Sequence, residues 1–189
     1  MPEQRFSGYR SGSCSHVVVR PCGVCQSVGR GQLLGEDIQD RGFRPDWICG
    51  PAIGGVICAQ YVALALKARC VFAERVFDDT GKTERFEIKR GYDEIVRGQS
   101  VLIVDDVVNA VFSVCLMYEA VVQSGGHPMG VAAYVNRGNV GAVDLGVENF
   151  IFLDEVLLPS WPAEDCPLCQ AGVPVNVRYV HGSEFVGRE

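Results

Sequence analysis

Apolar and polar positions form alternating blocks along the middle of the chain, and the blocks predict strands and helices in turn. Short apolar runs are typical of buried strands, and the longer apolar segments between them have helical length. The expected strands are residues 46–50, 70–74, 100–104, 129–135 and 149–153, and the expected helices are residues 32–40, 56–68 and 113–123. Strands that alternate with helices favour βαβ units, so the expected fold class is α/β with a parallel sheet.

The clearest strand, residues 100–104, runs directly into two carboxylates, Asp105 and Asp106. A loop then leads to the expected helix that begins near Ser113. In open α/β sheets ligands bind beyond the carboxyl ends of the strands, and a helix start suits an anion. The two acids would repel an anion directly but suit hydroxyl groups or a metal ion. A sugar phosphate offers hydroxyls to the acids and a phosphate to the loop, so this segment predicts a sugar-phosphate site.

The segment 76–98 is polar and charged, with turn signals at Asp78, Asp79 and Gly81. It predicts a β-hairpin or a flap beside the sheet. The two chain ends, residues 1–31 and 159–189, are rich in Gly, Pro, Ser and Cys and lack helical periodicity. We expect one domain of 189 residues, with a core over residues 32–158 and a small hood subdomain formed by both ends.

Composition limits the classes of partner. About half of the 189 residues are apolar and 21% are charged, as in an ordinary globular domain. The net charge of −6 argues against a nucleic-acid partner, for which a basic face is expected. No run is long and apolar enough for a bilayer, and residues 1–12 do not resemble a signal peptide, so a cytoplasmic protein without a membrane partner is expected.

The nine cysteines include two pairs with CxxC spacing, Cys22/Cys25 and Cys166/Cys169. This spacing lets two thiolates meet one metal ion, so the pairs predict a structural zinc site that joins the two chain ends. Structural thiols without a metal are the alternative, and the sequence leaves both open. A disulfide framework is not expected in a reducing cytosol.

Several motifs in one order resemble the orotate branch of the type I phosphoribosyltransferases. The segment VLIVDDVV resembles the phosphoribosyl-pyrophosphate signature of that family, and five further segments fit the orotate branch. In chain order they are SG at 11–12, GPAIGGV at 50–56, VFAER at 71–75 with KRG at 89–91, NRG at 136–138 and CPLCQAG at 166–172. Each piece alone is weak, whereas the ordered set is specific.

The resemblance implies the type I phosphoribosyltransferase fold, a parallel sheet flanked by helices with a hood. It also implies transfer of a phosphoribosyl group from phosphoribosyl pyrophosphate to orotate, giving orotidine 5′-monophosphate and pyrophosphate in pyrimidine nucleotide biosynthesis. Mg²⁺ would accompany phosphoribosyl pyrophosphate, and the protein would be a homodimer.

The resemblance also assigns roles to individual residues. Asp105 and Asp106 would hold the ribose hydroxyls, and Arg137 would pair with the orotate carboxylate, with Arg10 as a weaker contact. The phosphate would lie on Asn109, Ala110, Val111, Phe112 and Ser113, the pyrophosphate near Ile53, Gly54 and Gly55, and the cations for the leaving group would be Arg75, Lys89 and Arg90.

One segment departs from the family pattern. Family loops usually read Thr-Thr-Gly-Gly where this chain has Asn-Ala-Val-Phe at 109–112. Val111 disfavours the positive φ that a glycine there would allow, and Phe112 adds bulk. The alternative functions are therefore a catalytically weak relative that binds phosphoribosyl pyrophosphate or a nucleotide, and a phosphoribosyltransferase for another nucleobase. Arg137 argues for a base that carries a carboxylate.

Overall fold

The computed structural model describes residues 5–7, 13–16, 24–78, 84–109, 111–157, 160–162 and 165–174. The chain divides into two compact units, one of residues 22–156 and the other of residues 1–21 with 157–189. The first residue of the larger unit lies ten positions before the core boundary expected at residue 32, because a helix that starts at Val24 belongs to this unit.

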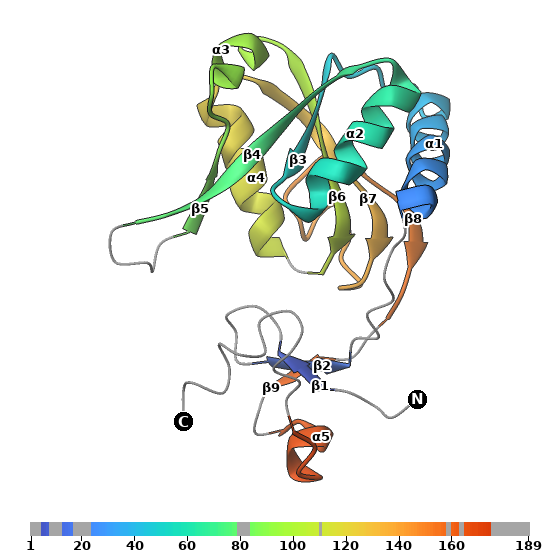
Figure 1. The fold of residues 1–189 in the computed structure, drawn as a ribbon, viewed down its shortest axis with the longest axis vertical. Coiled ribbons are helices and arrows are strands. Elements are labelled where there is room, and N and C mark those ends of the chain that lie inside the picture. Colours follow the sequence, from blue (N-terminus) through green and yellow to red (C-terminus); the bar gives the residue numbers. More distant parts are fainter. Residues whose placement is uncertain are drawn as a thin grey trace. The chain divides into compact units, whose positions relative to one another are not determined.

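The larger unit is built on a six-stranded sheet in the order β5-β4-β3-β6-β7-β8 (Figure 1). β4 and β5 pair antiparallel, and the other neighbouring strands pair in parallel. The predicted α/β class with a parallel sheet is therefore confirmed, and the predicted hairpin is the β4/β5 pair. The strands are β3 (Trp47–Pro51), β4 (Arg69–Phe77), β5 (Glu84–Glu87), β6 (Ser100–Val108), β7 (His127–Asn136) and β8 (Phe150–Glu155).

Helices cover both faces of this sheet (Figure 1). α1 (Val24–Asp40) and α2 (Gly54–Leu66) lie on one face, and α4 (Val111–Gln123) lies on the other, while the short α3 (Tyr92–Val96) precedes β6. β6 is buried from both sides. Val101 and Ile103 belong to the core cluster that includes Met117 of α4, and Leu102 and Val104 belong to the cluster formed with α1 and α2.

Helix α1 differs from its prediction, which placed a short helix at residues 32–40 and none before it. Three glycines, Gly29, Gly31 and Gly35, lower the helix propensity of this segment. A Cβ atom at Gly31 would overlap Tyr61 of α2, and one at Gly35 would lie 2.6 Å from the Cβ of Ala65. These two glycines let α1 lie directly against α2, so packing stabilises a helix that propensity alone does not predict.

The smaller unit holds an antiparallel sheet in the order β1-β2-β9. Its strands are β1 (Arg5–Ser7), β2 (Ser13–His16) and β9 (Ser160–Pro162), and the short α5 (Pro167–Gln170) follows them. Cys14 of β2 lies opposite Trp161 of β9, so the two chain ends pair with each other in this unit.

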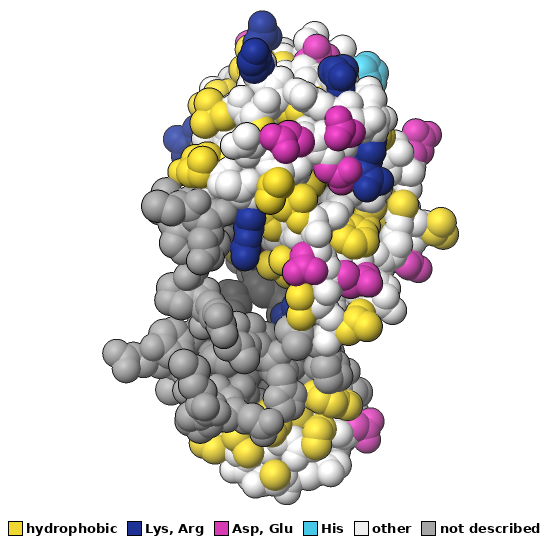
Figure 2. All heavy atoms as spheres, turned by 90° about the vertical axis from the view of Figure 1, so that its right-hand side faces the viewer, with side chains coloured by type: hydrophobic (Ala, Val, Ile, Leu, Met, Phe, Trp, Pro, Cys, Tyr) yellow, Lys and Arg dark blue, Asp and Glu magenta, His cyan; other side chains and the backbone are white. Residues whose placement is uncertain are grey.

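Within the part of the chain that the structure describes, no helix combines the length and the apolar character needed to cross a membrane. Seen from the side of α1, exposed hydrophobic side chains are interspersed with acidic and basic ones (Figure 2).

Candidate active site

The acidic pair lies inside β6 and not beyond its end. The strand continues through Asp105 and Asp106 to Val108, four residues further than predicted. Asp105 still pairs with Ala133 of β7, and Val108 pairs with Asn136, so ladder hydrogen bonds to β7 explain the extension. The extra length carries both carboxylates on a rigid strand at the carboxyl edge of the sheet, where ligands of open α/β sheets bind.

The two carboxyl groups have different surroundings. Asp105 is half-buried and its Oδ1 accepts a hydrogen bond of 2.8 Å from the backbone amide of Asp106, whereas Asp106 is exposed. Burial raises the pKa of the Asp105 carboxyl well above its usual value, and the neighbouring Asp106 carboxylate raises it further, while Arg75 opposes the rise. Two carboxyl groups this close are stabilised by ligand hydroxyls or by a cation.

The glycine loop between β3 and α2 lies directly against this pair. A Cβ atom at Gly54 would lie 2.9 Å from Oδ2 of Asp106, and one at Gly55 would lie 2.9 Å from Oδ1 of Asp105. Only glycine permits this approach of backbone to carboxylate. Ile53, where the loop enters α2, is 84% exposed, and the peptide bond before it is cis. The structure thus brings the predicted pyrophosphate loop and the predicted ribose-binding acids together.

The expected phosphate segment begins with Asn109, which is exposed, and Ala110 lies outside the described residues. Helix α4 starts at Val111, two residues earlier than predicted. Val111 therefore has helical backbone and packs against the core, so the predicted conflict with a positive φ does not arise. Phe112, in the first turn, is 54% exposed, and Ser113 is half-buried. The start of α4 lies at the same edge of the sheet as the acidic pair, with its first amides available to an anion.

Arg137 follows β7 at this edge. Its backbone amide donates a hydrogen bond of 2.8 Å to the carbonyl of Val108, the last residue of β6. Its guanidinium atoms Nε and Nη2 are buried and have no hydrogen-bond partner among the described residues. Burial lowers the pKa of this guanidinium. Because unpaired buried donors are costly, these two nitrogens indicate a site that binds an anionic group.

The three predicted flap cations divide into two groups. Arg75 of β4 lies over the ring of Phe86, 5.3 Å from its centroid, and interacts with Asp105. Lys89 is paired with Glu87 at 3.0 Å, and Arg90 is paired with Glu74 at 2.6 Å. The structure thus joins Arg75 to the acidic pair and holds Lys89 and Arg90 on carboxylates of the β4/β5 hairpin.

Sequence reasoning missed Glu74 and Glu87 as partners of these cations. They lie directly opposite each other in the β4/β5 ladder. Like charges in such a pair repel, so neighbouring cations stabilise them. The charged residues around Lys89 and Arg90 indicated ion pairs, but the register of the hairpin was needed to identify the partners.

Besides Ala110, three predicted site residues are not tested by the described structure. Arg10 and Cys22 lie outside the described residues, and so does the side chain of Cys25. Cys166 is buried beside Leu168 in the smaller unit, with Cys169 packed against them. Among the residues that are described, no group of three or more His, Cys, Asp or Glu side chains could hold a metal ion. The zinc site therefore stays a prediction.

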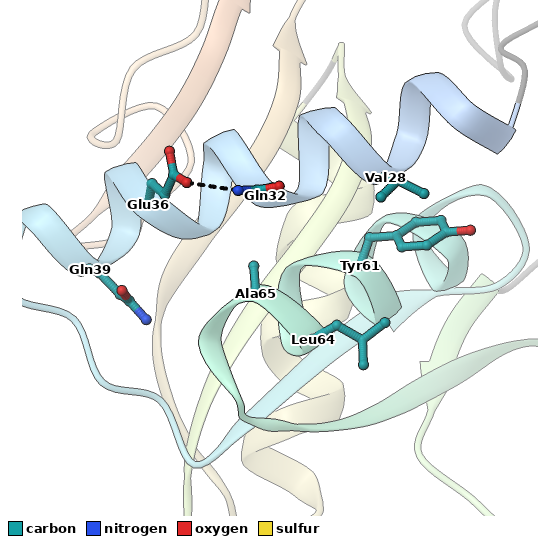
Figure 3. A pocket seen from close by; sticks show the side chains of 7 residues that line it. All are labelled: Val28, Gln32, Glu36, Gln39, Tyr61, Leu64 and Ala65. Atoms are coloured by element: carbon teal, nitrogen blue, oxygen red, sulfur yellow. Dashed lines mark hydrogen bonds between the residues drawn. The ribbon is translucent and has the colours of Figure 1, made fainter.

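A hollow lies between α1 and α2, and its lining includes none of the predicted site residues. It has a volume of about 400 Å³, and its lining includes Gln32 and Glu36 of α1 and Tyr61 and Leu64 of α2 (Figure 3). Gln32 donates a hydrogen bond of 3.1 Å to Glu36 along the helix. The chemistry-bearing residues lie instead at the carboxyl edge of the sheet.

A parallel sheet with an acidic pair on its central strand and a glycine loop beside it defines the class of protein, the type I phosphoribosyltransferase fold. The model of the phosphoribosyl transferase domain family matches residues 31–155, and the chain belongs to that family.

Individual relatives agree with this assignment. The chain is 33% identical over 167 residues to an orotate phosphoribosyltransferase of Caldanaerobacter subterraneus subsp. tengcongensis, covering 87% of this chain and 83% of that protein. It is 41% identical over 154 residues to one of Pelotomaculum thermopropionicum, covering 80% and 76%. The fold is similar to that of Mycobacterium tuberculosis orotate phosphoribosyltransferase in complex with 5-phospho-alpha-D-ribosyl 1-diphosphate, with a TM-score of 0.53, 22% identity, and coverage of 69% of this chain and 74% of that one.

Proposed function

We propose that this protein transfers the phosphoribosyl group of phosphoribosyl pyrophosphate to orotate, releasing pyrophosphate and giving orotidine 5′-monophosphate. Curated relatives that bear the name of this activity span most of the chain. The observation in the structure that carries the proposal is the pair of buried guanidinium nitrogens of Arg137, Nε and Nη2, which have no partner among the described residues and follow β7 at the same edge of the sheet as the acidic pair. A planar guanidinium fits a carboxylate through two parallel hydrogen bonds, and orotate carries that carboxylate.

In the proposed reaction the bond between the anomeric carbon and pyrophosphate breaks, and the electron pair leaves with pyrophosphate. A bond from the same carbon to a ring nitrogen of orotate forms, and the proton of that nitrogen passes to a pyrophosphate oxygen or to water. Asp105 and Asp106 accept hydrogen bonds from the ribose hydroxyls, and the backbone at Gly54 and Gly55 approaches the pyrophosphate. Catalysis then rests on positioning and on stabilisation of the charge that develops on the ribose and on pyrophosphate.

Mg²⁺ belongs to this proposal as an ion bound to phosphoribosyl pyrophosphate. The carboxylate oxygens of Asp105 and Asp106 are hard ligands that suit Mg²⁺ or its bound waters. The described residues offer no larger acidic group, so pyrophosphate oxygens and water would complete the coordination shell. When bound, the ion would neutralise charge on the leaving group. Arg75, Lys89 and Arg90 are proposed to contribute further positive charge, the last two after exchanging Glu87 and Glu74 for phosphate oxygens.

A homodimer and a cytoplasmic location complete the proposal. The homodimer rests on the resemblance, in which the flap is commonly shared between subunits, and sedimentation of the purified protein tests it. The alternative of a catalytically weak binding protein is not favoured, since the strain expected at Val111 is absent and the curated relatives are named as enzymes. Among the described residues of the site, none favours another nucleobase over one that carries a carboxylate.

The test is a spectrophotometric assay of orotate consumption with phosphoribosyl pyrophosphate and Mg²⁺. We expect wild-type turnover, and we expect Arg137→Gln to raise the KM for orotate by roughly 30-fold or more, since breaking a buried charged pair costs about 2 kcal/mol or more. The matched control is Arg41→Gln, which removes an exposed pair with Asp37 and should change the KM less than twofold. No wild-type turnover, or equal effects of the two variants, would contradict the proposal.

A further inference from the structure

The turn that follows β7, residues 136–141, connects two parts of the active site. Arg137 in this turn is the proposed partner of the orotate carboxylate. Gly138, the next residue, contacts Asn109, the first residue of the proposed phosphate segment. One short turn therefore touches the segment for the phosphate and carries the side chain for the base.

The contact at Gly138 is between two backbones. A Cβ atom at this position would overlap the carbonyl oxygen of Asn109 and lie 2.8 Å from its carbonyl carbon. Gly138 does not have a positive φ, so its backbone conformation alone does not demand glycine. Glycine is required at position 138 because the backbone of Asn109 lies against it, and a backbone atom cannot move aside as a flexible side chain does.

Hydrogen bonds fix the turn on both sides. The amides of Arg137 and Gly138 both donate to the carbonyl of Val108, at 2.8 and 3.3 Å. The buried side chain of Asn136 donates from Nδ2 to the carbonyl of Val140 and to Glu155, both at 3.0 Å. With these bonds the turn has little freedom to shift alone, so a displacement of Asn109 moves Gly138 and Arg137 with it.

We propose that Gly138 is a positioning residue that couples the phosphate half of the site to the carboxylate half. Binding of a phosphate at residues 109–113 fixes Asn109, and through the contact at Gly138 it fixes the backbone of Arg137 in the position that binds the carboxylate. Orotate then binds more tightly when a sugar phosphate is present, and the reverse also holds because coupling between two ligands is reciprocal. This inference rests on the proposed function of Arg137.

The experiment measures orotate binding by calorimetry with and without ribose 5-phosphate, in wild type, Gly138→Ala and Gly141→Ala. Gly141 is the matched control because it lies in the same turn, and a Cβ there would meet only Asp144 at an ordinary 3.5 Å. We expect ribose 5-phosphate to tighten orotate binding at least about fivefold in wild type and in Gly141→Ala, which is the lower end of typical coupling. In Gly138→Ala the factor should fall below about two, with the KM values for both substrates raised more than kcat is lowered.

A merely structural role would lower the melting temperature of Gly138→Ala and leave the coupling factor unchanged, which would overturn the inference. A coupling factor of one in wild type would also overturn it.

If Gly138→Ala does not fold, inorganic phosphate replaces ribose 5-phosphate in an experiment on wild type, since a phosphate ion bound at the segment 109–113 does not reach the base. If inorganic phosphate still tightens orotate binding, the result supports transmission through the turn. If it leaves orotate binding unchanged, the inference is overturned. Wild type that turns over orotate but shows no coupling refutes this inference alone, whereas wild type that binds no orotate refutes the proposed function.

Discussion

Two aspartates at opposite edges of the six-stranded sheet differ in their surroundings, because neighbouring donors stabilise the charge of Asp46 at the amino edge, whereas burial and Asp106 oppose the charge of Asp105 at the carboxyl edge. Oδ2 of Asp46 accepts hydrogen bonds from the Ser100 hydroxyl at 2.6 Å and from the Ser100 amide at 3.0 Å, which ties β3 to β6 where both begin. These bonds lower the pKa of the Asp46 carboxyl. At the other end of β6, burial and then the nearby Asp106 raise the pKa of Asp105.

Two arginines, one at each edge of the sheet, show the same contrast. Arg69, at the start of β4, lies over the ring of Trp47 with 5.3 Å to its centroid. Arg137, at the carboxyl edge, has two buried nitrogens that find no partner in the described parts of the chain. Asp46 and Arg69 at the amino edge thus stabilise the sheet, whereas Arg137 at the carboxyl edge keeps two donors that a ligand could use.

The sharpest way to break this comparison is to neutralise each aspartate in turn. Asp105→Asn should lower kcat/KM by about 10²–10³-fold, because it removes an acceptor from the proposed ribose site, while its melting temperature at pH 7 stays equal to or above that of wild type. Asp46→Asn should keep activity within about twofold and lower the melting temperature, because its hydrogen bonds serve only the fold. The assay of orotate consumption and thermal unfolding together check both variants. If Asp46→Asn loses activity without losing stability, the division between the two edges is wrong.

The carboxyl edge could be predicted from the sequence because its parts depend on local patterns. The apolar run before Asp105 identifies a buried strand, and parallel strands place their carboxyl ends at one edge. The same rule places Gly54 and Gly55, which follow β3, beside the acidic pair of β6. The role of Arg137 came only with the resemblance, and its burial without partners needed the structure.

Other features could not be predicted, since they depend on packing between distant segments. The first half of α1 is helical because Gly31 and Gly35 fit against α2. Helix α4 starts at Val111 because that side chain packs into the core, which a comparison with Thr-Thr-Gly-Gly loops does not reveal. The contact of Gly138 with Asn109 joins the exits of β6 and β7 and leaves no periodic signal.

A smaller effect is expected where two helices begin at the carboxyl edge. α2 begins with Gly54 and Gly55, whose missing side chains make room for the acidic pair, whereas α4 begins with Val111 and Phe112. Replacing Val111 and Phe112 together by glycine should therefore change kcat/KM less than about tenfold and lower stability by roughly 1–2 kcal/mol, through lost packing and helix propensity. Urea unfolding and the orotate assay measure the two effects. A large gain in activity would mean that these side chains obstruct the phosphate segment.

The smallest expected effect is the pH dependence of stability, which distinguishes the two aspartates by sign. A raised pKa means that folded Asp105 holds its proton above the usual value of 3.8, so its contribution favours the fold at low pH and is lost as the pH rises through the raised pKa. The lowered pKa of Asp46 has the opposite consequence, since its contribution is present above 3.8 and is lost as the pH falls through the lowered value. The melting temperature of Asp105→Asn should therefore rise relative to that of wild type as the pH rises above about 4. The melting temperature of Asp46→Asn should stay below that of wild type above about pH 4, and the difference should shrink only below about pH 4. Parallel curves for wild type and Asp105→Asn would mean that the carboxyl at the ligand edge is as well solvated as an ordinary surface group.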